Sequence, residues 1–165
     1  MLRDFHNLPY LDQLDFNINM YGSGDTTYER LETILMAFVP VLSNVPKDQP
    51  LESLNLQCIF LTYSCKQCQD MLDPQRVWPI LDQALDKFAE NLSRKMVKVN
   101  VTFKLDFGGI DSDWFVEPTN AVALKEIVEM VLRIVPKAQT NSKIDMNIVT
   151  EFCSVVVYPD SFKHS

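Results

Sequence analysis

The stretch Leu14-Asp15-Phe16-Asn17-Ile18 alternates apolar and polar side chains, and three further stretches of this kind recur along the chain. Strict alternation predicts a β-strand with one buried face and one face in contact with water. The four copies begin at residues 14, 54, 99 and 144. The later three are Leu54-Asn55-Leu56-Gln57-Cys58, Val99-Asn100-Val101-Thr102-Phe103 and Ile144-Asp145-Met146-Asn147-Ile148.

Segments with helical periodicity separate these predicted strands. They extend from about Tyr28 to Leu42, from about Pro74 to Leu92 and from about Thr119 to Val135, with apolar residues recurring every three or four positions. Pro118 and Pro136 bracket the third segment. A further apolar stretch, from Phe152 to Tyr158, favours one more strand, which would cap the sheet or pair at its edge.

The predicted order of elements is therefore β-α-β-α-β-α-β. Alternation of strands and helices favours parallel neighbours, because each crossover returns the chain to the same end of the sheet. In a parallel sheet covered on both faces, the strand sequences are continuous apolar runs. Each copy here instead keeps two polar residues on one face. We expect one α/β domain over residues 1–165, a short and irregular solenoid of about four parallel strands with helices on one face.

The residues around the strands resemble leucine-rich repeats. Leu11-x-x-Leu14-x-Phe16-x-x-Asn19 follows the pattern Leu-x-x-Leu-x-Leu-x-x-Asn, and Leu51-x-x-Leu54-x-Leu56 follows its first half. The units are longer than the 20–29 residues of ordinary repeats. Together with the segment Trp78-Pro79-Ile80-Leu81-Asp82-Gln83-Ala84-Leu85, they resemble the C-terminal repeat region of fungal F-box-type proteins. In that case the chain is a fragment of a longer repeat protein or lacks an adaptor-binding part.

The resemblance implies a non-catalytic module that binds another protein through the polar strand positions, in the role of a substrate-recognition part. Alternation alone places the same residues on the wet face, where ordinary solvation is an equally good reason for their polarity. The candidate partner-binding residues are Asp15, Asn17, Asn19, Asn55, Gln57, Asn100, Thr102, Lys104, Asp145 and Asn147.

The charge balance excludes several other classes of partner. The chain carries 22 acidic and 15 basic residues, a formal net charge of −7, and no cluster of Lys and Arg that would bind nucleic acid or anionic lipid. No apolar run reaches the roughly 18 residues of a membrane span. With no secretory signal at the N-terminus, we expect a cytoplasmic or nuclear protein with reduced cysteines.

Few residue patterns indicate chemistry. The junction Gly22-Ser23-Gly24-Asp25-Thr26-Thr27, between a predicted strand and helix, leaves one alternative open: a small α/β enzyme or nucleotide-binding protein that holds phosphate there. It lacks the third glycine of a dinucleotide fingerprint and the Lys of a P-loop. Turn formation and helix capping explain the junction better, so we expect no enzyme and no cofactor.

Two other groups of residues are weak candidates for metal binding. Cys65-Lys66-Gln67-Cys68 has no second pair of ligands at zinc spacing, and His6 and His164 lie near the two ends of the chain. The acidic residues Asp106, Asp111, Asp113 and Glu117 lack the spacing of a calcium loop. Trp114 and Phe115, in the same region, are expected in the core rather than as partner anchors. We therefore expect no metal site.

Overall fold

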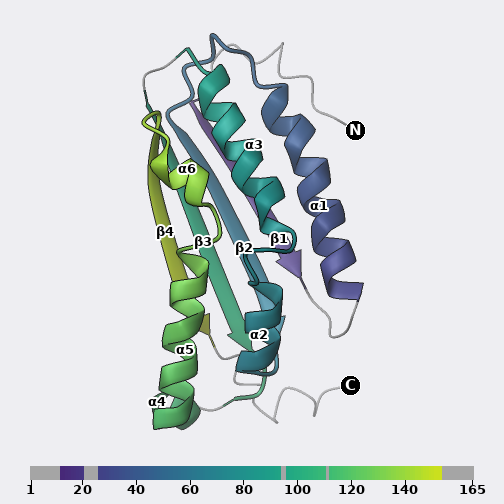
Figure 1. Ribbon diagram of the computed structural model, residues 1–165, viewed down its shortest axis with the longest axis vertical. Coiled ribbons are helices and arrows are strands. Elements are labelled where there is room, and N and C mark those ends of the chain that lie inside the picture. Colours follow the sequence, from purple (N-terminus) through teal and green to yellow (C-terminus); the bar gives the residue numbers. More distant parts are fainter. Residues whose placement is uncertain (1–11, 21–25, 94–95, 111, 154–165) are drawn as a thin grey trace, which may run out of the picture.

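The computed structural model describes residues 12–20, 26–93, 96–110 and 112–153. Strands and helices alternate along the chain (Figure 1). Their order is β1 (Gln13–Met20), α1 (Thr26–Ser43), β2 (Ser53–Thr62), α2 (Cys65–Met71), α3 (Trp78–Asn91), β3 (Val97–Phe107), α4 (Ser112–Val116), α5 (Pro118–Val131), α6 (Pro136–Thr140) and β4 (Ile144–Cys153).

The four strands form one parallel sheet in the order β1-β2-β3-β4, which confirms the four predicted strands and their α/β arrangement. The first three copies of the repeated stretch are aligned, because Leu14 pairs with Leu54 and Leu54 with Val99. The fourth copy is shifted by two residues, so that Val99 pairs with Met146. A shift by an even number of residues leaves every side chain on its predicted face.

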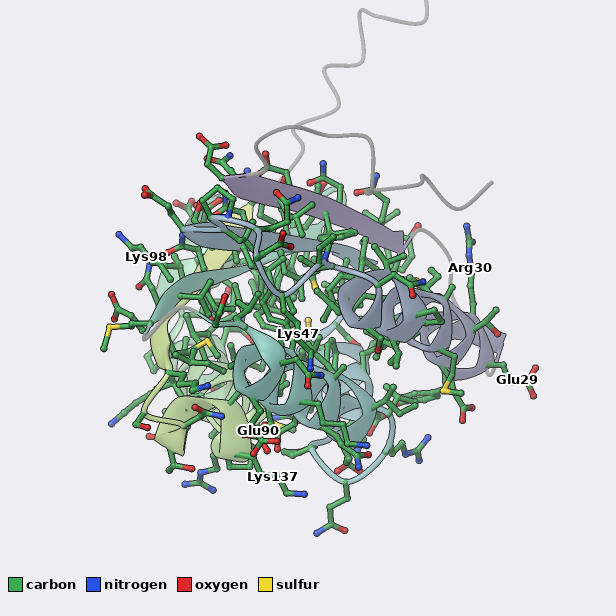
Figure 2. All side chains as sticks on the ribbon, turned by 90° about the horizontal axis from the view of Figure 1, so that it is seen from above. Glu29, Arg30, Lys47, Glu90, Lys98 and Lys137 are labelled. Carbon is green, nitrogen blue, oxygen red and sulfur yellow. The ribbon has the colours of Figure 1, made fainter. Side chains whose placement is uncertain are left out.

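All helices of the described part of the chain lie on one face of the sheet, as expected, and none of the described elements covers the other face, here called the open face (Figures 1 and 2). Helix α1 packs beside α3, α3 beside α6, and α2 beside α5. None of the helices in the described part of the chain is long and apolar enough to cross a membrane.

The core lies between the helices and the inner face of the sheet. Its centre is an aromatic cluster in which the Trp78 ring lies 5.4 Å from Phe103 and 6.2 Å from Phe60, between ring centroids. All three side chains are buried. The Nε1–H of Trp78 donates a hydrogen bond of 2.9 Å to the Met71 carbonyl, which gives the one polar atom of the ring a partner. This bond joins the end of α2 to the start of α3.

Two of the predicted helices differ from the structure. The second was expected from about Pro74, but residues up to Val77 form turns in which the Asp73 carboxylate accepts from the Gln75 amide, and α3 begins only at Trp78. The third was expected to reach Val135, but α5 ends at Val131. Pro136 then opens a separate short helix, α6, because proline is compatible with the first turn of a helix.

Candidate interaction surface

The open face of the sheet carries all ten residues predicted to contact a partner. They form rows across the strands, because the pairing register aligns them. The described part of the sheet has a ladder row (Asp15, Asn55, Asn100, Asn147), a middle row (Asn17, Gln57, Thr102, Val149) and a charged row (Asn19, Ile59, Lys104, Glu151). The tenth predicted residue, Asp145, pairs with Lys98 at one end of the face.

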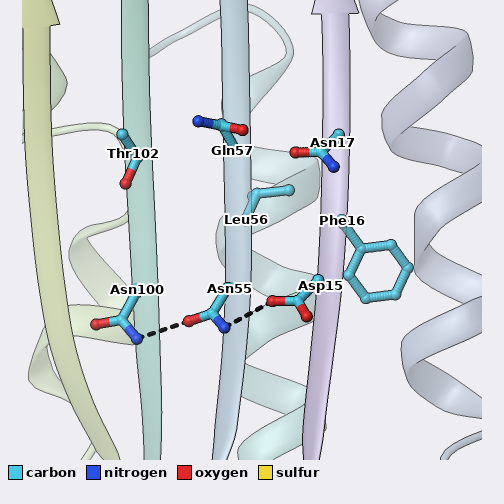
Figure 3. A pocket seen from close by; sticks show the side chains of 8 residues that line it. All are labelled: Asp15, Phe16, Asn17, Asn55, Leu56, Gln57, Asn100 and Thr102. Atoms are coloured by element: carbon cyan, nitrogen blue, oxygen red, sulfur yellow. Dashed lines mark hydrogen bonds between the residues drawn. The ribbon is translucent and has the colours of Figure 1, made fainter.

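Side-chain hydrogen bonds run along the whole ladder row, and Figure 3 shows the two that join Asp15, Asn55 and Asn100. Asn147 Nδ2 donates to Asn100 Oδ1 at 3.3 Å, Asn100 Nδ2 to Asn55 Oδ1 at 2.7 Å, and Asn55 Nδ2 to Asp15 Oδ1 at 2.7 Å. Gln13 Nε2 also donates to both carboxylate oxygens of Asp15, at 3.0 and 2.8 Å. The row therefore joins side chains from all four strands.

The chemistry of Asp15 dictates the direction of this ladder. An ionised carboxylate only accepts hydrogen bonds, so Asn55 must turn its NH₂ group towards β1. The Asn55 carbonyl oxygen then faces Asn100, which must donate in turn, and the same reasoning applies to Asn147. Every amide in the row points its donor towards Asp15 as a result. The Oδ1 atom of Asn147 is left as the acceptor at the outer end of the row.

The donors around Asp15 also affect its ionisation. Hydrogen bonds from Asn55, and to a smaller extent from Gln13, lower the pKa of the Asp15 carboxyl below its ordinary value, because they stabilise the charged form. Asp15 is exposed to solvent, so these bonds rather than burial set the direction of the shift. The ladder is thus anchored by a carboxylate that stays ionised at neutral pH.

The middle row differs from the ladder row in its hydrogen bonding. Within the described residues, the side chains of Asn17, Gln57 and Thr102 have no hydrogen-bond partner, although each has donors and acceptors. A shallow depression of about 370 Å³ lies over these two rows (Figure 3). Six predicted residues line it, namely Asp15, Asn17, Asn55, Gln57, Asn100 and Thr102. The depression therefore combines a row whose side chains bond to one another with a row whose donors and acceptors have no partner among the described residues.

Towards the carboxyl ends of the strands, the open face carries an ion pair and two apolar side chains in place of the amides. Lys104 Nζ lies 3.5 Å from Glu151 Oε2, between the half-buried Ile59 and the free edge of the sheet. Val149, in the middle row, is 38% exposed. Val149, Glu151 and Lys98 also lie on this face but are not among the residues predicted from the sequence. Continuing the alternation from Asn147 in steps of two residues reaches Val149 and then Glu151, and one step back from Asn100 reaches Lys98.

The cysteines show no sign of activation. Burial raises the pKa of Cys58 and of Cys68 to about 12, and it also raises that of Cys65. A reactive thiol or a metal ligand requires the opposite shift. No group of three or more potential metal ligands occurs in the described part of the chain. The position of Cys58 on the buried face of its strand is as predicted.

The acidic loop is explained by packing. Trp114 and Phe115 are half-buried, and their rings lie 5.1 and 5.8 Å from that of Phe107 in the core, between centroids. Their expected role in the core is confirmed. Asp111 lies outside the described residues, whereas Asp106 belongs to β3 and Asp113 to α4.

Several predictions concern residues that the structure does not describe. The junction from Gly22 to Thr27 is one of them, apart from the helical backbone of Thr26 and Thr27 at the start of α1. His6 and His164 are others. Of the apolar stretch after Phe152, only Phe152 and Cys153 are described, as the last residues of β4. The phosphate-binding alternative therefore stays a prediction.

No family model, no curated protein and no solved structure matches the chain.

Proposed function

We propose that this chain is a non-catalytic interaction module that binds another protein on the open face of its sheet. The observation that supports this most is the middle row, where Asn17, Gln57 and Thr102 offer unused donors and acceptors from three adjacent strands. A partner can bind these groups without breaking any hydrogen bond between residues that the structure describes. The ladder row beside them is already satisfied and fixes the side chains around the depression.

Rigid support is important because binding is weakened by the entropy lost when side chains are immobilised. Asp15, Asn55 and Asn100 hold each other in place on the floor of the depression, and Asn147 continues the row beyond it. The polar lining favours a partner that supplies hydrogen-bonding groups, such as extended main chain or amide side chains. The net charge of −7 adds a preference for a partner with a basic surface.

The finer part of the proposal is a leucine-rich-repeat-like solenoid that serves as the substrate-recognition part of an F-box-like protein. The parallel strands in chain order support it. One feature departs from the repeat pattern, since Asn19 continues the alternation and lies exposed on the open face. The proposed place of action is the cytoplasm or nucleus, which agrees with four free cysteines.

The experiment compares two substitutions of the same type. Gln57→Arg places a long cation in the depression, whereas Gln83→Arg makes the same change on the exposed surface of α3. A photo-reactive amino acid at position 102 then captures bound protein from a lysate of the source cells. We expect a discrete cross-linked species that Gln57→Arg abolishes and Gln83→Arg preserves. Equal cross-linking in both variants, or a nucleotide that co-purifies with the native protein, would contradict the proposal.

A further inference from the structure

Strand β4 forms an outer edge of the sheet. It is ten residues long and, among the residues that the structure describes, it pairs only with β3. Natural edge strands are commonly protected by Pro, Lys, a bulge or short length. The sequence of β4, Ile144-Asp145-Met146-Asn147-Ile148-Val149-Thr150-Glu151-Phe152-Cys153, contains neither Pro nor Lys, and its register with β3 is continuous. This edge is therefore open to pairing.

The pairing of β3 with β4 shows which main-chain groups face outward. The Val97 amide donates to the Lys143 carbonyl at 2.8 Å, and Val97 is the register partner of Ile144. In a parallel pair, alternate residues of a strand point their N–H and C=O groups towards the same neighbour. The odd-numbered residues of β4 thus face β3. The main-chain groups of Met146, Ile148 and Thr150 face the free edge.

The side chains at this edge favour different groups of a neighbouring strand on the two faces of the sheet. On the open face, Asn147 Oδ1 ends the ladder and accepts no hydrogen bond from the described residues, since Asn147 Nδ2 is directed to Asn100. On the helix face, a depression of about 310 Å³ is lined by Leu132, Gln139, Met146 and Ile148. Leu132 is 48% exposed there. A neighbouring strand would need a donor on one face and an apolar side chain on the other.

We propose that the free edge of β4 binds an extended strand of another protein, in which apolar side chains flank an Asn or Gln that donates to Asn147 Oδ1. The apolar residues of that strand fill the depression beside Met146 and Ile148. Its main chain pairs with the outward groups of Met146, Ile148 and Thr150. The required order, apolar-amide-apolar, reads the same in both directions. This site is separate from the depression over Gln57 and does not rest on the proposed function.

Head-to-tail stacking of a second copy of this chain meets the requirement poorly. Stacking of β4 on β1 of the next copy, with the ladder in register, would bring Asn147 Oδ1 against the Asp15 carboxylate. Both groups are acceptors, and Asp15 already accepts from Asn55 and Gln13. The direction of the ladder therefore opposes head-to-tail assembly of identical copies and favours a partner that brings a donor.

The test uses two synthetic peptides that differ at one residue. Both alternate Val and Thr and carry Lys at each end for solubility, and the central residue is Asn in one and Asp in the other. Binding to the full chain is measured by NMR titration, with backbone amide shifts followed along β4. We expect the Asn peptide to bind with shifts centred on residues 146–150. The Asp peptide should bind about tenfold more weakly, because it places acceptor against acceptor.

Two variants of the protein test the geometry. Thr150→Pro removes an outward N–H without removing a bond to β3, so it should block the peptide while circular dichroism and thermal melting stay near those of the wild type. Asn147→Leu removes the acceptor and should abolish the preference between the two peptides. This second variant keeps the test decisive if Thr150→Pro does not fold.

Three results would overturn the proposal. They are equal binding of both peptides by the wild type, undiminished binding by folded Thr150→Pro, and dimerisation in sedimentation experiments without peptide that Thr150→Pro abolishes. Gln57→Arg serves as a separate control. It should leave peptide binding unchanged even if the open face turns out to have no partner.

Discussion

The Asp82 carboxylate in α3 accepts a hydrogen bond of 2.9 Å from the main-chain amide of Ala138, 56 residues further along the chain. Its second oxygen accepts from the Lys137 amide at 3.2 Å. Asp82 is only 4% exposed. A buried anion in α3 thus binds the first amides of α6, which no local side chain caps. This contact fixes the last helical segment before β4 against the middle of the fold.

Replacement of Asp82 should destabilise the whole chain. Asp82→Ala leaves two amides of α6 without their acceptor, and we expect the free energy of unfolding to fall by about 2–3 kcal/mol. Asp82→Asn retains one acceptor oxygen and should cost about half as much. Urea denaturation followed by circular dichroism measures both. Asp145→Ala, at an exposed position of the open face, is the matched control and should change little. Equal losses for Asp82→Ala and Asp145→Ala would show that the buried contact contributes no stability.

The ladder row should be visible in the titration of Asp15. Its pKa is lowered chiefly by the hydrogen bond from Asn55, so Asn55→Ala should raise the pKa of Asp15 towards its ordinary value. NMR of the side-chain carboxyl carbon against pH measures this. The matched control is Gln57→Ala, next to Asn55 on the same face, which should leave the titration unchanged. An unaltered pKa in Asn55→Ala would mean that this bond is not formed in solution.

The same shift gives the ladder a defined pH dependence. Because the pKa of Asp15 is lower in the folded chain than in the unfolded chain, its contribution to stability is fully present above the unfolded value near 3.8. The contribution is lost as the pH falls from there through the lowered native pKa. Thermal melting between neutral pH and this acid range should therefore show a smaller acid-induced loss for Asp15→Asn than for the wild type. Identical losses would exclude a coupling between this carboxylate and folding.

The thiols should react in two groups. Cys58 and Cys68 are fully buried, and burial raises the pKa of both to about 12, so neither forms a thiolate at neutral pH. Cys65 and Cys153 are half-buried. Treatment of the native protein with N-ethylmaleimide, followed by peptide mass spectrometry, should label Cys65 and Cys153 first. Cys58 and Cys68 should be labelled only after unfolding. Early labelling of Cys68 would indicate that α2 opens readily.

The central tryptophan is expected to be the most sensitive position of the core. Trp78→Phe leaves the buried Met71 carbonyl without its donor and creates a small void beside Phe103, and together these should cost about 2–4 kcal/mol. Guanidinium denaturation measures the loss. Trp114→Phe, in the half-buried cluster on Phe107, should cost clearly less. A larger loss for Trp114→Phe would place the main core elsewhere.

The alternating stretches predicted the strands well because the physical reason is local. A strand with one face in water must alternate polar and apolar side chains. Asp15, Asn55 and Asn100 each lie in a stretch of five residues that shows this alternation. The register of the last strand was harder to predict from the sequence. The fourth copy suggests that Asp145 aligns with Asn100, whereas Asn147 does so in the structure. An alternating pattern defines a face but tolerates any even shift, so packing and turns decide the alignment.

The short helices and the cap on α6 were not predicted from the sequence, for a different reason. Segments as short as α2 and α6 have too few turns for a periodic signal and are stabilised by contacts from elsewhere. Ser64 caps α2 locally, as its hydroxyl accepts from the Gln67 amide, and this Ser-x-x-Gln signal was available in the sequence. The partner of α6 is Asp82, which sequence spacing cannot reveal because it lies 55 residues away.

The single direction of the amide ladder has an electrostatic consequence. Three side-chain dipoles add head to tail across the strands, with their positive ends towards Asp15 and their negative end at Asn147 Oδ1. Dipoles of the crossover helices run along the strands instead, and strand dipoles are small. The amides thus present a partial negative charge at the β4 end of the row, whereas at the β1 end their positive ends face the full negative charge of the Asp15 carboxylate. A row of neutral amide side chains in this way favours one orientation of a polar partner over the reverse.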